Sequence, residues 1–124
     1  MDARETMRGA MLLGPERIEI REVPVSRPGP GEILLSVEAA TTCGTDVKVY
    51  RRGGHPRMLQ VPTLFGHEMA GRVAAVGDGV TTFSIEDAVV VVNSAPCGAC
   101  GPCHEERENL CEDLQYINGA YAEF

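Results

Sequence analysis

Short stretches of alternating hydrophobic and polar residues recur along the first part of the chain. Residues 8–13 and 18–23 are two such runs, and the segment 14–17, which begins with Gly-Pro, separates them. Alternation with a period of two is typical of strands, and a Gly-Pro pair between two strands indicates a turn. The pattern therefore predicts a β-hairpin at the start of the chain.

Three further segments have the composition of strands. Residues 32–40 carry apolar side chains on both faces and residues 88–92 form a continuous apolar run, so both are predicted to be well-buried strands. Residues 69–76 are a third strand, and the Gly-Asp-Gly of residues 77–79 is a turn. This turn also begins like a glycine-rich nucleotide-binding fingerprint, but the third glycine and the following helix are missing, so we interpret it as structural.

Little helix is expected: one short segment, besides the charged residues 105–108, which we interpret as a solvated helical face. Thr42, Thr45 or Asp46 is the expected cap of a helix that runs to about Arg52. At the other end of the chain, residues 118–124 have the pattern of a strand cut short. Short strands with turn signals and little helix predict a mainly β fold, either a small β-barrel or a β-sandwich.

The cysteines bring candidate chemistry into this picture. Four of the five cysteines lie within fifteen residues: Cys97, Cys100, Cys103 and Cys111. Small residues between the first three let the backbone wrap around one ion, and four thiolates are a common ligand set for a structural zinc. Two disulfides, with three possible pairings, are the alternative. We favour zinc, because the spacing is that of a closed metal site and the sequence has no secretory context.

Charge and length exclude several classes of function. The 124 residues suit one domain, and their formal net charge of −7 argues against binding to nucleic acid or to an anionic membrane surface. No signal peptide and no apolar stretch long enough to span a membrane is recognised. The odd number of cysteines fits reduced, metal-binding thiols, so we predict a cytoplasmic protein.

A second group of residues has the composition of an open zinc site. The fifth cysteine, Cys43, taken alone, is better explained as a buried core residue than as a metal ligand. His67 and Glu68 supply the other two side-chain types that bind zinc, and an open site needs three such ligands. Asp46 is placed to accept the second ring proton of His67, an interaction that metal-bound histidines usually need.

Taken together, these motifs resemble a known family. Cys43-Gly-Thr-Asp46, Gly66-His67-Glu68 and the four-cysteine segment occur in the order found in zinc-dependent medium-chain dehydrogenases/reductases, which include alcohol, sorbitol and threonine dehydrogenases. The Pro-Gly-Pro-Gly-Glu of residues 28–32 and the end of the chain, residues 119–124, are similar as well. The resemblance covers nearly all of residues 1–124, but only the N-terminal, GroES-like catalytic domain of the family.

The resemblance implies a fold and a set of roles. The fold would be a GroES-like β-barrel with a short helix and a zinc-binding cysteine lobe, which we define as residues 94–114. Cys43 and His67 would be ligands of a catalytic zinc, Glu68 a ligand that binds directly or moves in during water exchange, and Thr45 the hydroxyl that passes on the substrate proton. The four lobe cysteines would hold a structural zinc.

The resemblance also implies what this chain does not contain. A Rossmann domain, which binds NAD or NADP in the family, has no counterpart in residues 1–124, so it would lie in the full-length enzyme or on a partner chain. We therefore expect these residues alone to be inactive. We also expect a bare surface around Tyr121 and Phe124, where the cofactor domain would pack, which would allow the chain to form a homodimer. Two departures from the family pattern are Lys48, at a position that carries a relay histidine in some members, and Glu86-Asp87 in place of Gly-Asp.

Two hypotheses remain open from the sequence. The chain is the catalytic domain of an enzyme that oxidises a small alcohol or polyol, or it is a stand-alone zinc-binding domain with a structural or partner-binding role and no redox activity. A nucleic-acid-binding zinc ribbon is a weaker third hypothesis, because a negative net charge opposes binding to phosphates.

Overall fold

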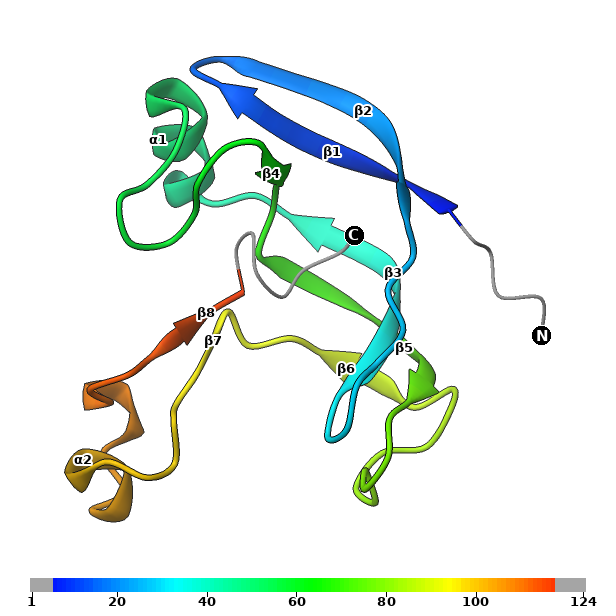
Figure 1. The fold of residues 1–124 in the computed structure, drawn as a ribbon, viewed down its shortest axis with the longest axis vertical. Coiled ribbons are helices and arrows are strands. Elements are labelled where there is room, and N and C mark those ends of the chain that lie inside the picture. Colours follow the sequence, from blue (N-terminus) through cyan, green and yellow to red (C-terminus); the bar gives the residue numbers. More distant parts are fainter. Residues whose placement is uncertain (1–5, 118–124) are drawn as a thin grey trace.

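The computed structural model describes residues 6–117 of the chain, in which strands predominate (Figure 1). The strands are β1 (Thr6–Gly14), β2 (Arg17–Pro24), β3 (Ile33–Thr41), β4 (Thr63–Leu64), β5 (Glu68–Val76), β6 (Ala88–Val90), β7 (Ser94–Ala95) and β8 (Gln115–Tyr116). The helices are α1 (Gly44–Arg52), α2 (Gly101–His104) and the 3₁₀ turn η1 (Glu108–Leu110). The mainly β fold is therefore confirmed.

Three antiparallel sheets organise these strands. Two sheets have three strands each, in the orders β2-β1-β4 and β3-β5-β6, and the third pairs β7 with β8. Figure 1 shows β7, β8 and α2 projecting away from the two larger sheets. The cysteine lobe is thus a separate projection, and the two larger sheets with α1 form the main body.

The predicted hairpin is present and its turn is fastened to α1. The backbone N–H of Glu16, at the tip of the turn, donates to the carbonyl of Tyr50 over 2.8 Å, and the Tyr50 hydroxyl donates to the carbonyl of Glu16 over 3.0 Å. The small core lies beneath this connection, where Leu12, Val49 and Leu59 are buried together. Strand β1, helix α1 and the loop before β4 are therefore held by one cluster.

The β3–β5 pair forms the other half of the body. Its register runs from Ile33 opposite Val76 to Thr41 opposite Glu68, with irregularities at two points. A Cβ atom at Gly71 in β5 would lie 2.0 Å from the carbonyl oxygen of Ser36, so the close approach of the two strands requires glycine there. This ladder matters for function because its last pair lies beside the candidate site.

Two predictions about burial were wrong. Strand β3 is only half-buried, because its irregular register breaks the alternation and one face of an antiparallel sheet can face water. The predicted strand 88–92 shortens to β6, and Val90 and Val92 are 80% and 73% exposed. Strand β6 is the last in its sheet and pairs only with β5 among the described residues, so its apolar side chains are left uncovered.

Strand β5 and the turn after it match the predicted positions, whereas the expected strand at residues 118–124 lies outside the described residues. No helix within residues 6–117 has the length and apolar character that crossing a membrane requires.

Candidate metal centres

The end of the β3–β5 ladder brings together residues that are far apart in the sequence. Thr41 and Glu68 are the last paired residues of the two strands. Cys43 follows Thr41 by two residues and His67 precedes Glu68 by one, so both lie just beyond this last pair. Their reactive atoms, Cys43 Sγ and His67 Nε2, are 3.3 Å apart.

Gly66 allows the chain to enter β5 in this way. Its φ of 128° belongs to a region that side chains other than glycine rarely adopt. Because Gly66 immediately precedes His67, this backbone conformation helps to set where the imidazole enters the site.

Asp46 connects the helix to the histidine. Helix α1 begins at Gly44, with Cys43 as its N-cap, so the expected caps Thr42, Thr45 and Asp46 were wrong. Asp46 instead occupies the third position of the helix, where its Oδ2 accepts the backbone N–H of Cys43 over 2.9 Å. The sequence did not show which residue is the N-cap and which accepts its N–H, since any of several polar residues close to the start of a helix can serve as its cap.

The second carboxylate oxygen of Asp46 faces the imidazole. Its Oδ1 lies 3.2 Å from His67 Nδ1, and both side chains are almost fully buried, with 4% of each exposed. A buried carboxylate needs such polar partners to offset its desolvation. Oδ1 makes no hydrogen bond within the described residues, so the contact is one of close approach to Nδ1. With the carboxylate on the Nδ1 side of the ring, the other nitrogen, Nε2, is available as a ligand on the side of Cys43.

Of the other predicted residues, Glu68 lies beside this pair, and Thr45 and Lys48 lie along helix α1. Glu68 Oε1 is 3.9 Å from His67 Nε2, while Glu68 Oε2 accepts a hydrogen bond of 2.8 Å from the Thr41 hydroxyl. Thr45 is half-buried in the first turn of α1, and Lys48, further along the same helix, is exposed. Thr41 was not singled out from the sequence; its position opposite Glu68 follows only from the strand register.

The donor atoms suit a zinc ion. Cys43, Asp46 and His67 offer ligand atoms that lie within 4.8 Å of one another. In a tetrahedral site with zinc–sulfur and zinc–nitrogen distances of about 2.3 and 2.1 Å, the two ligand atoms are about 3.6 Å apart. The 3.3 Å between Cys43 Sγ and His67 Nε2 is close to that spacing. Asp46, which lies 3.2 Å from the far side of the ring, is placed to orient the histidine.

The four cysteines of the lobe also converge. Cys97, Cys100, Cys103 and Cys111 place their sulfur atoms within 4.8 Å of one another. Cys100 Sγ is 3.4 Å from Cys103 Sγ and 4.0 Å from Cys111 Sγ. Sulfur atoms around a tetrahedral zinc are about 3.8 Å apart, so the arrangement fits a closed four-thiolate site.

The surroundings shift the pKa values of two of these thiols in opposite directions. Backbone hydrogen bonds from Glu112 and Cys103 lower the pKa of Cys100 to about 7. Burial, followed by the hydrogen bond with Cys100, raises the pKa of Cys103 to about 12. Thiolate is the form that binds metal, and Cys100 forms it most readily of these two.

An open pocket adjoins the Cys43–His67 pair. It has a volume of about 240 Å³ and is largely apolar. Its polar edge includes Thr41, Thr42 and Glu68, and its other lining residues are Ala10, Val37, Ala40, Asp46, Phe65 and Gly66. The pocket therefore gives the side of the site that carries Glu68 a connection to the surface.

Comparison with known proteins places this arrangement in a family. Residues 29–124 match the alcohol dehydrogenase GroES-like domain. The chain is 34% identical to the sorbitol dehydrogenase of Bacillus subtilis, a match that covers 97% of this chain and 36% of that protein.

Two solved structures share the fold. One is a protein named short chain alcohol dehydrogenase from Escherichia coli CFT073, complexed with the cofactor NADH. It has a TM-score of 0.81 and 32% identity over 97% of this chain and 34% of that chain. The other is a cobalt- and zinc-bound thermostable alcohol dehydrogenase from Pyrobaculum aerophilum, with a TM-score of 0.78 and 37% identity over 86% of this chain and 32% of that chain.

These comparisons confirm the GroES-like fold that the sequence motifs implied. The chain spans about a third of the length of the relatives that it matches. The family match nevertheless extends over most of the chain, and it includes both groups of candidate ligands. The chain belongs to the alcohol dehydrogenase GroES-like domain family, within the zinc-dependent medium-chain dehydrogenases/reductases.

Proposed function

We propose that this chain is the catalytic domain of a zinc-dependent alcohol or polyol dehydrogenase. Completed by a Rossmann domain, it would oxidise a small alcohol or polyol to a carbonyl compound with hydride transfer to NAD or NADP. The observation that carries the proposal is the 3.3 Å approach of Cys43 Sγ and His67 Nε2, with Asp46 against the other ring nitrogen. The relatives named above support the reaction class.

Each side chain has a distinct task in this proposal. Cys43 and His67 would hold the catalytic zinc, with Glu68 as a conditional ligand. A zinc ion bound there acts as a Lewis acid on the alcohol oxygen. Asp46 keeps the imidazole oriented so that Nε2 faces Cys43.

The substrate proton needs an acceptor beside the site. Thr45, half-buried in the first turn of α1, is the side chain we assign to receive and pass on that proton. Lys48 stands exposed on the same helix, so the onward path from Thr45 differs from one that uses a relay histidine.

The cysteine lobe has a structural part in the proposal. Cys97, Cys100, Cys103 and Cys111 would hold a second zinc with no coordination position left for substrate. Reduced thiols of this kind fit a cytoplasmic location, which is part of the proposal.

Zinc analysis of the 124-residue chain under reducing conditions tests the two sites. We expect one tightly held zinc in the lobe and a smaller, sub-stoichiometric fraction at the second site, because an open site exchanges its metal more readily than a closed one. Cys43→Ser and His67→Ala should each remove that second fraction. His104→Ala is the matched control, because this histidine is exposed and belongs to neither ligand set.

Activity must be measured on the polypeptide that includes a Rossmann domain. Alcohol-dependent reduction of NAD or NADP should be lost in Cys43→Ser and retained in His104→Ala. Zinc at both sites with no such activity toward any alcohol or polyol would instead favour a structural or partner-binding role.

A further inference from the structure

The hydrogen bond between Thr41 and Glu68 joins the fold to the candidate metal ligand. The Thr41 hydroxyl and Glu68 Oε2 are 2.8 Å apart, and the two residues are directly paired across β3 and β5. Threonine has few side-chain rotamers because it is branched at Cβ. The ladder therefore fixes the position from which Thr41 holds the carboxylate.

The carboxylate stands slightly too far away to share a zinc ion with His67. Two oxygen and nitrogen ligands of one tetrahedral zinc are about 3.4 Å apart. Glu68 Oε1 is 3.9 Å from His67 Nε2, and Glu68 lies outside the group of mutually close ligand atoms formed by Cys43, Asp46 and His67. The Glu68–His67 distance is about half an ångström longer than that ligand spacing, and because Glu68 is not part of the mutually close group, its carboxylate must also move toward Cys43 to share the zinc.

Little besides the hydrogen bond from Thr41 holds the Glu68 carboxylate away from the metal site. Its side chain is 37% exposed and lines the open pocket beside Thr41, so packing does not hold it tightly. His67, in contrast, is nearly fully buried against Asp46. One carboxylate oxygen is tied to the strand, and the other faces the site.

We propose that Thr41 is a positioning residue that holds Glu68 just outside the coordination shell of the Cys43–His67 metal. The hydrogen bond keeps one coordination position available, and its release lets the carboxylate reach the metal. This inference rests on the proposed function, because it requires a metal at Cys43 and His67.

Cobalt(II) bound to the full chain provides a readout other than activity. With zinc retained in the cysteine lobe, the cobalt spectrum of the Cys43–His67 site is taken as the difference between the wild type and Cys43→Ser. Thr41→Val keeps the shape of the side chain and removes the hydroxyl. We expect altered cobalt absorption bands and, by the usual size of such outer interactions, cobalt release to a chelator that is about tenfold slower.

Three further variants define the effect. Thr41→Ser restores the hydroxyl and should restore the wild-type spectrum and release rate. Thr42→Val is the matched control, because Thr42 is an exposed threonine of the same pocket and makes no hydrogen bond to Glu68 in the described structure. Thr41→Val combined with Glu68→Gln should lose most of the slowing, because an amide is a poorer metal ligand than a carboxylate.

The possible results separate this inference from the proposed function. If the wild type binds no cobalt that depends on Cys43 and His67, both fail. If it binds cobalt but Thr41→Val leaves the spectrum and the release rate unchanged, or makes release faster, the positioning role of Thr41 is overturned while the metal site stands. Slowing that persists at full size with Glu68→Gln overturns it as well.

Discussion

At the scale of single residues, Asp46 has the central place in the candidate site. One oxygen accepts the N–H of Cys43 and the other faces the ring of His67, so one buried carboxylate links the start of α1 to the start of β5. The link to His67 was predictable from residue types, because a metal-bound histidine needs an acceptor. The link to Cys43 and the hydrogen bond from Thr41 were not, because they depend on the helix start and on strand register.

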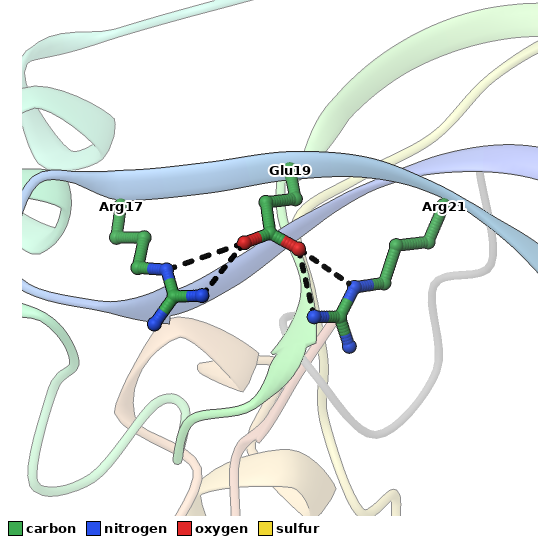
Figure 2. Close-up of polar contacts among 3 residues, drawn as sticks. All are labelled: Arg17, Glu19 and Arg21. Atoms are coloured by element: carbon green, nitrogen blue, oxygen red, sulfur yellow. Dashed lines mark hydrogen bonds and ion pairs between the residues drawn. The ribbon is translucent and has the colours of Figure 1, made fainter.

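A different carboxylate, Glu19 on β2, gives a prediction about pH. Arg21 and Arg17 flank it along the strand and donate to its two oxygens, with closest distances of 2.7 and 2.8 Å (Figure 2). These hydrogen bonds, that of Arg21 first, lower the pKa of Glu19 below its ordinary value of 4.5. A lowered pKa in the folded state stabilises the protein above pH 4.5, and this contribution is lost as the pH falls through the folded pKa.

We therefore expect Glu19→Gln to lower the melting temperature slightly at pH 7, and the difference from the wild type to shrink as the pH falls below 4.5. The effect is small because the three side chains are exposed. Thermal unfolding of both proteins from pH 7 to pH 3, with and without 1 M salt, measures it. A difference that is constant with pH, or unaffected by salt, would show that the charge of Glu19 does not cause it.

At the scale of elements, the positions of helices and strands were predictable from local sequence patterns, whereas the burial of a strand, which depends on its tertiary neighbours, was not. The β1–β2 hairpin, helix α1 and strand β5 were predictable because their signals are local: alternation, turn residues and a helix stop at Gly53. The burial of β3 and β6 was not, because it depends on what covers a strand. Val90 is apolar, like most core residues, yet within residues 6–117 it lies on the last strand of its sheet and is exposed.

The cysteine lobe gives a prediction at this scale. Its elements within the described structure are short, namely β7, α2 and η1, and its only sheet contact there is the pairing of β7 with β8 just beyond the lobe, so we expect a metal to supply most of its stability. Cys103→Ser should abolish the tight zinc, whose binding in small structural sites is worth on the order of 10 kcal/mol. The lobe should then unfold while the β3–β5 ladder stays folded, because the buried core residues lie in the body rather than in the lobe.

Zinc analysis together with hydrogen exchange measures this outcome. Amide protection should be lost over the lobe, residues 94–114, and kept in β5. Ala99→Ser is the matched control, because it changes an exposed residue of the same turn without removing a thiol. One zinc per chain and intact lobe protection in Cys103→Ser would show that the four cysteines are not the ligand set.

At the scale of the whole molecule, apolar surface remains uncovered on both larger sheets. Ile20 of β2 is 65% exposed. It lies on the same strand face as Ile18, which pairs with the fully buried Leu12, but its own partner across the hairpin is the small residue Ala10. Val90 of the other sheet is exposed as well, and so is Val92, two residues after that strand ends. The bare surface that we expected around Tyr121 and Phe124 lies outside the described residues. Ile20, Val90 and Val92 are the most exposed of the large apolar side chains in the described part of the chain, so they are the strongest candidates there. Exposed apolar side chains of this kind invite self-association or a partner.

The last prediction is that these 124 residues, expressed alone, do not transfer hydride. The reaction needs the nicotinamide ring held close to the substrate carbon, and such positioning supplies much of the reduction in the barrier. Residues 6–117 contain no βαβ unit, and the Gly-Asp-Gly after β5 forms a turn without a following helix, so no dinucleotide cradle is present in the described part of the chain.

Titration with NADH should show no binding, alcohol should not drive reduction of NAD or NADP, and sedimentation should show a tendency to dimerise. The polypeptide that includes a Rossmann domain, assayed in parallel, is the positive control. Steady turnover by the 124 residues alone would mean that they form a cofactor site without that domain.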